Sequence, residues 1–429
     1  MVMPGRLGRK PLLLQIQQES NLCLLVPSSE SDGSSWARSL VGDSCWIEFE
    51  GSPESFQEAA AAVQAWTAGS ADRHIEGVLT WDEFGVELCA AVCQHLQLPG
   101  TPLAQATAFR SKLAFRERCR RAGIPAVRGA EIRRLDDLEA IVAKPESWHF
   151  PSVLKPTRGG GSWYTMKVES PEELGIQFSR LSRDISEGFS QELCNAGFVL
   201  EEYFAGQEVD VDGWARKGQV EFCLVSDNRP ATEPHFLEMG GVYPSQLPEQ
   251  VVIELQALTA RVIAEFDFHG CFHFEAKVRW QGSSVEVMPL ELNGRLGGAE
   301  CPASFKAVTG YNLAEVAALL AFDLPVPEHL ERKQHNVVAS VNLHIPERGT
   351  LERCSDSRVD AVGTKLVLSV VLGKVGQQHI PANGSRSCLG WLATGGDTLE
   401  EAERNLSLAI AQLDMVVLGD NGERFTPVV

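Results

Sequence analysis

The chain has 429 residues, of which 44% are hydrophobic and 22% are charged, so it is expected to be a globular protein with two to four domains. Its 38 basic and 57 acidic residues give a formal net charge of −19, and no basic cluster offsets it. We therefore expect no nucleic-acid partner, because a phosphate backbone needs a concentrated positive surface. No apolar run approaches the roughly 18 residues that cross a bilayer, so no membrane association is expected.

The cysteines indicate a reducing compartment. All eleven are scattered without a Cys-x-x-Cys pair, and Cys89 and Cys93 have the i,i+4 spacing of one helix face. Buried thiols are favoured over a zinc site for this pair. The chain is expected to be cytoplasmic. Basic residues before the short apolar run Pro11–Ile16 leave a transit peptide as a minor alternative.

Residues 1–108 are predicted to form a small α/β unit. Short apolar runs alternate there with segments of helical spacing, which favours a parallel sheet. The predicted strands are Asn21–Pro27, Cys45–Phe49 and Gly77–Trp81, and the predicted helices are Pro53–Thr67 and Phe84–Leu96. Asp82 and Glu83 follow the third strand, at a sheet edge where ligands often bind, but a helix N-cap is the favoured explanation of Asp82.

A strongly basic helix is predicted after the linker at residues 98–102. It covers Phe109–Ala122 and contains Arg110, Lys112, Arg116, Arg118, Arg120 and Arg121. For most of these arginines we expect a role in surface charge compensation. Lys112, near the helix start, is the candidate for a ligand contact.

Residues 151–168 predict a strand, a glycine loop and a second strand. Gly159, Gly160 and Gly161 lie between Arg158 and Ser162, and Lys155 ends the first strand. Free backbone N–H groups in such a loop can surround phosphate oxygens while the lysine supplies a point charge. The loop lacks the Gly-Lys-Ser/Thr of a P-loop, and a flexible hairpin tip is the alternative interpretation.

The next informative stretch contains a predicted strand, Phe198–Leu200, and a connection, Glu201–Phe204. An extended connection exposes backbone groups that can bind an adenine edge, and the carboxylate of Glu208 could bind ribose hydroxyls. Asp210 and Asp212 alternate on the strand that follows. Considered alone, this stretch is also compatible with an ordinary acidic loop.

The strongest signal is a predicted hairpin, Cys271–Val278 and Ser284–Leu292, joined by turn residues 281–283. Its arms would place Glu275 beside Glu291 and Asn293, and such oxygen ligands suit Mg²⁺. Arg295 would point to the same place, and the glycines around it permit close approach of a ligand. A solvated hairpin face is the alternative.

The remaining chain is predicted to be structural. An apolar helix covers Asn312–Ala321, and strands cover Val337–Ile345, Lys365–Leu372 and Ser387–Thr394. A capping-box pattern at Thr398 begins a helix that ends near Leu413.

Taken in order, these stretches resemble the ATP-grasp superfamily, from about residue 80 to 325. The likeness is greatest to carboxylate–amine ligases of the L-amino-acid ligase and carnosine-synthase-like kind, in which His-x-Glu precedes a closing Glu-x-Asn-x-Arg. The resemblance implies an α/β and α+β fold. Its parts would be a Rossmann-like pre-ATP-grasp domain at 1–108, a central lid subdomain at 109–205, a catalytic subdomain at 206–330 and a C-terminal α+β extension at 331–429.

The resemblance also implies roles for individual residues. ATP would be bound by Lys112, Lys155, Arg158, Gly159, Gly160, Gly161, Ser162, Glu201, Glu202, Tyr203, Phe204 and Glu208. Glu275, Glu291 and Asn293 would hold Mg²⁺, with Mn²⁺ as an alternative cation, and Arg295 and His273 would be catalytic. This chain departs from the pattern at Gly294, where relatives have Pro, and at Gly240-Gly241, where many have Gly-His.

The implied reaction joins a carboxylate to an amine through an acyl phosphate and releases ADP and phosphate, with amino acids as the expected substrates. An ATP-grasp carboxylase or nucleotide-biosynthesis ligase is one alternative. An ATP-binding scaffold without catalysis is another. The oligomeric state stays open, and a homodimer is one option.

Overall fold

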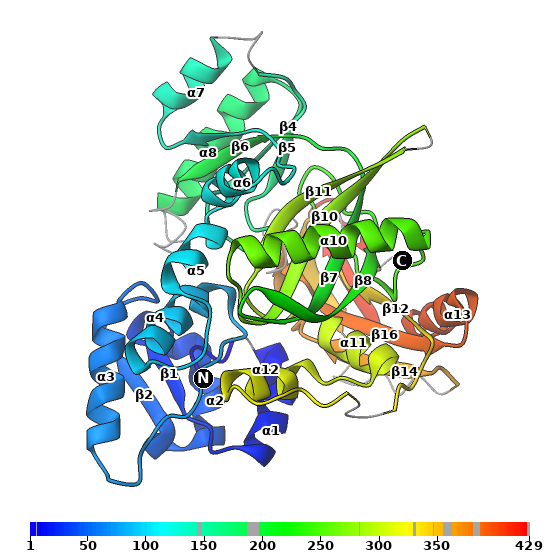
Figure 1. Cartoon of the computed structure of the whole chain (residues 1–429). Coiled ribbons are helices and arrows are strands. Elements are labelled where there is room, and N and C mark those ends of the chain that lie inside the picture. Colours follow the sequence, from blue (N-terminus) through cyan, green and yellow to red (C-terminus); the bar gives the residue numbers. More distant parts are fainter. Residues whose placement is uncertain are drawn as a thin grey trace.

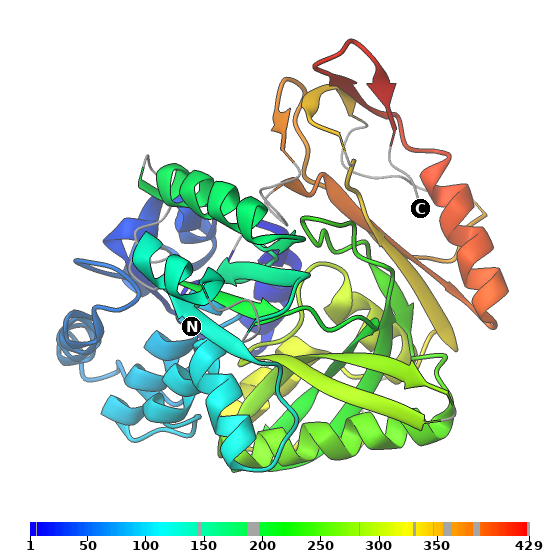
Figure 2. The ribbon, with the colours of Figure 1, turned by 90° about the horizontal axis from the view of Figure 1, so that it is seen from above.

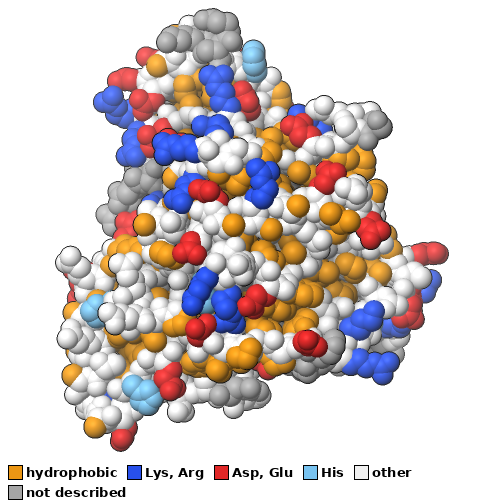
Figure 3. Space-filling model, in the orientation of Figure 1, with side chains coloured by type: hydrophobic (Ala, Val, Ile, Leu, Met, Phe, Trp, Pro, Cys, Tyr) orange, Lys and Arg blue, Asp and Glu red, His pale blue; other side chains and the backbone are white. Residues whose placement is uncertain are grey.

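The computed structural model describes residues 1–5, 7–143, 148–186, 197–282, 284–328, 332–345, 347–354, 363–380 and 387–426. Within these residues the strands form four sheets (Figure 1). The same part of the chain contains no helix with the length and apolar character that crossing a membrane requires. Acidic and basic side chains are interspersed over the face seen in Figure 3.

The N-terminal unit has a parallel pair of strands covered by helices, as the sequence predicts. Strands β1 (Leu24–Pro27) and β2 (Trp46–Phe49) pair in parallel. The predicted third strand at residues 77–81 has no regular secondary structure, although the Leu79 carbonyl accepts a hydrogen bond from the N–H of Val2 at 2.8 Å. The helices are α1 (Lys10–Glu19), α2 (Ser31–Val41), α3 (Phe56–Ala68) and α4 (Val86–Leu96), and the 3-10 turns are η1 (Leu7–Arg9), η2 (Ser28–Glu30), η3 (Asp43–Cys45) and η4 (Glu83–Gly85).

Two helices, rather than the single predicted one, connect this unit to the next. They are α5 (Leu103–Arg110) and α6 (Lys112–Arg121). Ser111 separates them, because its backbone is extended and its side chain caps α6 by accepting from the N–H of Ala114. The break places Lys112 at the first position of α6, where its N–H donates to the Thr157 carbonyl at 3.0 Å.

The central sheet lies apart from the others, at the top of Figure 1. Its strand order is β3-β6-β4-β5, with every neighbouring pair antiparallel. The strands are β3 (Gly129–Ile132), β4 (Ser152–Pro156), β5 (Met166–Val168) and β6 (Phe198–Glu202), and the helices are α7 (Leu135–Val142) and α8 (Pro171–Ser186). The glycine loop joins β4 to β5, as the sequence predicts.

An eight-stranded sheet forms the body of the molecule, in the order β11-β10-β7-β8-β9-β12-β16-β14. Its strands are β7 (Gln207–Arg216), β8 (Gln219–Asn228), β9 (Gly241–Tyr243), β10 (Gly270–Gln281), β11 (Ser284–Asn293), β12 (Val337–Asn342), β14 (Leu366–Val371) and β16 (Gly390–Gly396). The sheet runs across the domain boundary proposed at residue 330, so that boundary does not separate two sheets. Residue 283 of the predicted hairpin turn lies outside the described residues.

Opposite faces of this sheet carry different side chains. Phe272 and Phe274 of β10 belong to the same buried cluster as residues of α10 (Glu249–Glu265), whereas Cys271 packs with residues of α12 (Leu313–Ala321). Because side chains alternate along a strand, the odd-numbered positions of β10 face away from α10. This places the polar residues 273, 275 and 277 on the face away from α10.

The rest of the chain packs at the other end of the large sheet, where Figure 2 shows its last part, including α13, in orange and red. It contains α11 (Cys301–Thr309), α13 (Leu399–Ile410) and a small sheet of β13 (Gly349–Cys354), β15 (Gln378–His379), β17 (Met415–Gly419) and β18 (Arg424–Phe425). Thr398 caps α13 by accepting from the N–H of Glu401 at 3.2 Å, as the sequence predicts.

Candidate active site

Most of the predicted site residues line one pocket between the central sheet and the large sheet. They come from the glycine loop, from β6 and the chain after it, and from the hairpin. The predicted residues in its wall are Lys112, Lys155, Gly159, Gly160, Gly161, Ser162, Glu201, Glu202, Tyr203, Phe204, Glu208, Glu275 and Glu291. Two further residues line it: Glu238, which the resemblance places in the substrate pocket, and Lys277, which the sequence did not single out.

The hairpin brings the predicted metal ligands together. Glu275 lies opposite Glu291 and His273 opposite Asn293 in the antiparallel register of β10 and β11. The side-chain amide of Asn293 donates to Oε1 of Glu275 at 2.9 Å. This arrangement places two carboxylates and one amide in a small buried volume.

The two carboxylates differ strongly in their affinity for protons. Burial raises the pKa of Glu275 well above its ordinary value, and the charge of Glu291 raises it further. Burial opposes ionisation of Glu291 as well, but Lys112 and Lys155 outweigh it and lower the pKa of Glu291 to about 2. Adjacent buried oxygen donors that repel one another fit a divalent cation, so Glu275, Glu291 and Asn293 fit Mg²⁺.

The predicted phosphate lysines both lie in the pocket and both have carboxylate partners. Lys112 forms an ion pair with Glu291. Nζ of Lys155 lies 2.7 Å from Oε2 of Glu201, and burial lowers the pKa of Lys155. Because both side chains reach the wall of the same pocket, they can supply local positive charge in an acidic protein.

The expectation that most arginines of the basic helix compensate surface charge does not extend to two of them, which are buried. Arg116 is 0% exposed and places Nε 3.2 Å from Oε1 of Glu201, so Glu201 balances two cations. Arg110 is 4% exposed. The spacing carried a usable signal, because Arg116 follows Lys112 by four residues and shares its helix face.

The glycine loop is held by contacts with side chains outside it as well as by its own backbone conformation. Gly161 has φ +61°, and Ser162 and Tyr164 also have positive φ, which fixes a tight path. The carbonyl of Gly159 accepts from Nη1 of Arg110 at 3.2 Å, and Nη1 of Arg158 lies 2.6 Å from Oε2 of Glu87.

The predicted adenine segment is partly strand. Glu201 and Glu202 belong to β6 rather than to a connection, because they continue its pairing with β3 and β4. The N–H groups of Glu202 and Tyr203 already donate to the carbonyls of Arg128 and Pro151, at 3.0 and 3.3 Å. These two N–H groups are therefore occupied, and the candidate contact for a nucleotide base is the backbone that follows them.

The side chain of His273 faces Asp210 and Asp212, to which the sequence analysis gave a strand position but no role in the site. Its Nδ1 lies 2.9 Å from Oδ1 of Asp212, and its Nε2 lies 3.8 Å from Asp210 and 3.7 Å from Glu275. Burial opposes the charged ring, but the two aspartates outweigh it and raise the pKa of His273 well above its ordinary value. Period-2 spacing of Asp210 and Asp212 was the signal that they share one sheet face.

Cys301 completes this cluster. One donor atom each from Asp212, His273 and Cys301 lie within 4.8 Å of one another. Burial raises the pKa of the Cys301 thiol to about 12. A Cβ on Gly297 would lie 2.2 Å from the Cys301 sulfur, so this backbone position requires glycine.

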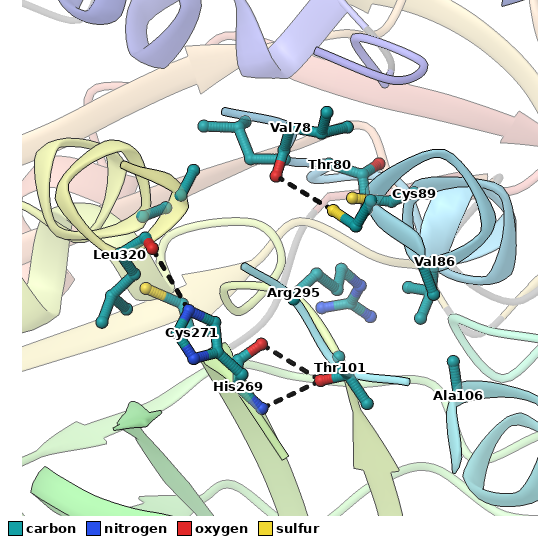
Figure 4. Close-up of a pocket in the computed structure, with 18 of the residues that line it drawn as sticks. Val78, Thr80, Val86, Cys89, Thr101, Ala106, His269, Cys271, Arg295 and Leu320 are labelled. Atoms are coloured by element: carbon teal, nitrogen blue, oxygen red, sulfur yellow. Dashed lines mark hydrogen bonds between the residues drawn. The ribbon is translucent and has the colours of Figure 1, made fainter. Parts of the chain in front are cut away.

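Arg295 lies beside the pocket wall rather than in it. Its Nε is 2.7 Å from Oε2 of Glu83, and it lines a neighbouring cavity of about 70 Å³ between Cys271 and Val86 (Figure 4). Asp82 is the N-cap of η4, accepting from the N–H of Phe84 at 2.9 Å, as the sequence predicts.

Arg9 is a site neighbour that sequence reasoning missed as a contact. Its Nη1 donates to the carbonyl of Gly297 at 2.7 Å, which fixes the backbone that follows Arg295. Burial and the charge of Arg295 lower the pKa of Arg9 to about 10. Arg9 and Gly297 are 288 positions apart in the sequence, so no local pattern signals their contact.

The central sheet, its glycine loop and the acidic hairpin of the large sheet together are the arrangement of an ATP-grasp fold. In agreement, residues 148–303 match the family model of the ATP-grasp domain. The chain therefore contains an ATP-grasp domain, as the sequence resemblance predicted.

Two curated relatives are ligases. The chain is 32% identical to carnosine synthase 1 of Gallus gallus over 258 residues, which are 57% of this chain and 27% of that protein. It is 22% identical to alanine–anticapsin ligase of Bacillus subtilis strain 168 over 312 residues, 67% of this chain and 64% of that protein. The matched region thus spans about a quarter of the carnosine synthase.

Solved structures agree on the fold. The L-amino acid ligase of Bacillus licheniformis has a TM-score of 0.70 at 18% identity and covers 94% of this chain and 93% of its own. The N5-carboxyaminoimidazole synthase of Aspergillus clavatus, solved in complex with ADP, has a TM-score of 0.64 at 16% identity and covers 96% and 97%. At these identities the likeness establishes the fold, and reactions of several kinds share it.

Proposed function

We propose that the chain is an ATP-dependent carboxylate–amine ligase that forms an amide or peptide bond through an acyl phosphate. The observation that carries the proposal is the pairing of Glu275 with Glu291, beside Asn293, in the pocket that also contains Lys112 and Lys155. The ligases among the sequence relatives support amino acids as substrates.

The proposed chemistry has two steps. The γ-phosphoryl group moves to a carboxylate oxygen, which gives ADP and an acyl phosphate. The amine then attacks the carbonyl carbon, phosphate leaves with the bonding electron pair, and the amine nitrogen loses a proton. Activation is needed because a carboxylate would otherwise have to expel oxide.

The chain's own residues would bind and orient the reactants. Lys112 and Lys155 would contact phosphate oxygens, and Glu275, Glu291 and Asn293 would hold Mg²⁺, whose contribution when bound is neutralisation of phosphate charge. Arg295 would donate to the acyl phosphate, for which its planar fork is suited. The glycine loop would exclude water from the intermediate.

The second step requires a cationic amine to give up its proton. Glu238, in the wall of the pocket, is the acid available to attract an ammonium group, since Glu208 is assigned to the ribose. Burial, reinforced by the charge of Glu208, raises the pKa of Glu238. We propose that the amine enters on this acidic side, away from Lys112 and Lys155.

The alternative from the fold is a carboxylase or a nucleotide-biosynthesis ligase, such as the Aspergillus neighbour. We favour the amino-acid ligase because the sequence relatives include an alanine–anticapsin ligase and a carnosine synthase. We also propose a reducing, cytoplasmic setting, because ten cysteines in the described residues are free thiols.

The test is a screen of amino-acid pairs with ATP and Mg²⁺, with chromatography of nucleotides and mass detection of products. ADP, phosphate and a dipeptide or amino-acid conjugate are expected. Glu291→Gln provides the matched control for phosphate released by a contaminating enzyme. Formation of AMP and pyrophosphate, or turnover only with bicarbonate, would contradict the proposal.

A further inference from the structure

A short segment of the N-terminal unit, Glu83–Glu87, contacts both the glycine loop and Arg295. It consists of η4 and the first two residues of α4. The loop belongs to the central sheet and Arg295 follows the hairpin, so this segment meets two parts of the site that are far apart in the sequence.

The glycine loop packs on this segment through three kinds of contact. Arg158 and Glu87 form an ion pair of 2.6 Å in which neither side chain is fully exposed. The rings of Trp163 and Phe84 lie with centroids 5.6 Å apart. A Cβ on Gly160 would lie 3.2 Å from Cγ of Glu83, so the loop backbone rests directly on this side chain.

One carboxylate of the segment holds two guanidinium groups. Oε1 of Glu83 lies 2.5 Å from Nη1 of Arg110, and Oε2 lies 2.7 Å from Nε of Arg295. Arg110 also donates to the carbonyl of Gly159 in the loop. Glu83 therefore connects Arg295 to the loop through a single intervening side chain.

The burial of Glu83 makes the positions of its two guanidinium partners depend on each other. Glu83 is 7% exposed, so water does not replace either guanidinium when that group moves. A buried carboxylate left without one of its cationic partners is costly, and the contact of Oε2 with Arg295 is a close ion pair without hydrogen-bond geometry. The position of Arg110, and with it the loop carbonyl, thus depends on where Arg295 holds the same carboxylate.

We propose that Glu83 is a positioning residue that couples the glycine loop to Arg295. The inference rests on the proposed function, because it assigns the loop to the nucleotide and Arg295 to the acyl phosphate. Glu83 touches neither reactant in this role. It ensures that the loop and the cation adopt their working positions together.

Hydrogen exchange of residues 158–163 in the nucleotide-free protein tests the coupling without requiring any activity. Glu83→Gln keeps the size of the side chain and removes the shared charge, so exchange of the loop should rise by at least about tenfold, while peptides of α10 keep their wild-type rates. Glu76→Gln is the matched control, since its exposed carboxylate lies in the same unit.

The second arm uses Arg295→Lys. This change should also speed exchange of the loop, and it should add little in the Glu83→Gln background, because both changes break the same connection. The proposal would be overturned if the two substitutions raised the exchange rate of the loop independently, so that their factors multiplied in the double variant. It would also be overturned if Glu83→Gln left loop exchange unchanged in a folded protein. If Glu83→Gln does not fold, Glu87→Gln and Arg295→Lys decide: a loop insensitive to either variant overturns it.

The functional readout separates positioning from simple support. With active enzyme, Glu83→Gln should lower kcat by about tenfold or more and leave KM for ATP within about threefold, since the phosphate lysines are untouched. A protein that binds no nucleotide would refute the proposed function. The loop exchange measurements would still decide the coupling.

Discussion

The pH dependence of stability should contain one contribution that can be isolated by a single substitution, Glu300→Gln. Glu300 is 6% exposed, and its Oε1 accepts a hydrogen bond from the Ser340 hydroxyl at 2.8 Å. Burial raises the pKa of Glu300 from 4.5 to about 7, and the neighbouring carboxylates of Glu238 and Asp212 act in the same direction. The folded protein therefore retains a proton that the unfolded chain releases above pH 4.5.

The sign and size follow from this difference. Between pH 4.5 and about 7 the folded state binds more protons than the unfolded state, so the free energy of unfolding falls as the pH rises. A difference of about 2.5 pH units, at about 1.4 kcal/mol each, corresponds to a loss of about 3 kcal/mol that is complete above pH 7. Glutamine imitates the protonated acid and cannot ionise.

The assay is urea denaturation of wild type and Glu300→Gln from pH 5 to 8. The variant minus wild-type difference should be smallest at pH 5 and grow by about 2.5 kcal/mol by pH 8. Glu58→Gln, on the exposed start of α3, controls for loss of a surface charge. A difference that is constant with pH would show that Glu300 is ionised in the folded protein and would refute the reasoning.

Three further outcomes are expected at the site. Glu291→Gln should abolish most activity, and a Mg²⁺ titration should restore only part of it, because one anionic ligand is lost. Arg295→Lys should leave ATP affinity almost unchanged while kcat falls about 10²-fold, and an unchanged Tm would show that the loss is catalytic. Arg9→Lys loses the oriented contact with Gly297, so kcat should fall with little change in ATP affinity; normal kcat would remove Arg9 from the site.

The elements with strong local signals were predictable from sequence. The hairpin of β10 and β11 alternates β-forming and polar residues, so the two arms and the closeness of Glu275 to Glu291 were predicted. The exact register was not, because a shift between Glu275 and Ala276 places Glu291 opposite Glu275 where strict alternation would place Leu290. The division between α5 and α6 was not predicted, because helical periodicity continues through Ser111 and only the capping contact reveals the break. The run at residues 77–81 is apolar like a strand but has no regular secondary structure.

The candidate site was predictable where its residues share a motif and not where they meet across the fold. Lys155, the glycine loop and the hairpin acids have characteristic spacings. Arg116 was not singled out from the other arginines of its helix, although its four-residue spacing from Lys112 places both on one face. Glu83 and Arg9 meet Arg295 and Gly297 through long-range packing, and one sequence without an alignment contains no record of such contacts.

The proposed function requires a protein with a net charge of −19 to hold a triphosphate, and the arrangement of charge is compatible with it. Every cation assigned to phosphate or acyl phosphate already has a carboxylate at its side: Lys112 with Glu291, Lys155 with Glu201, Arg158 with Glu87 and Arg295 with Glu83. These pairs orient the cations and balance their charge before an anion arrives, which isolated buried lysines and arginines could not achieve without a large cost. A phosphate anion that arrives with a divalent cation brings both signs of charge. The phosphate would then pair with the lysine, and the metal ion would pair with the carboxylate that the lysine releases. The acidic residues of the pocket are then part of the phosphate site, and the overall negative charge does not oppose binding.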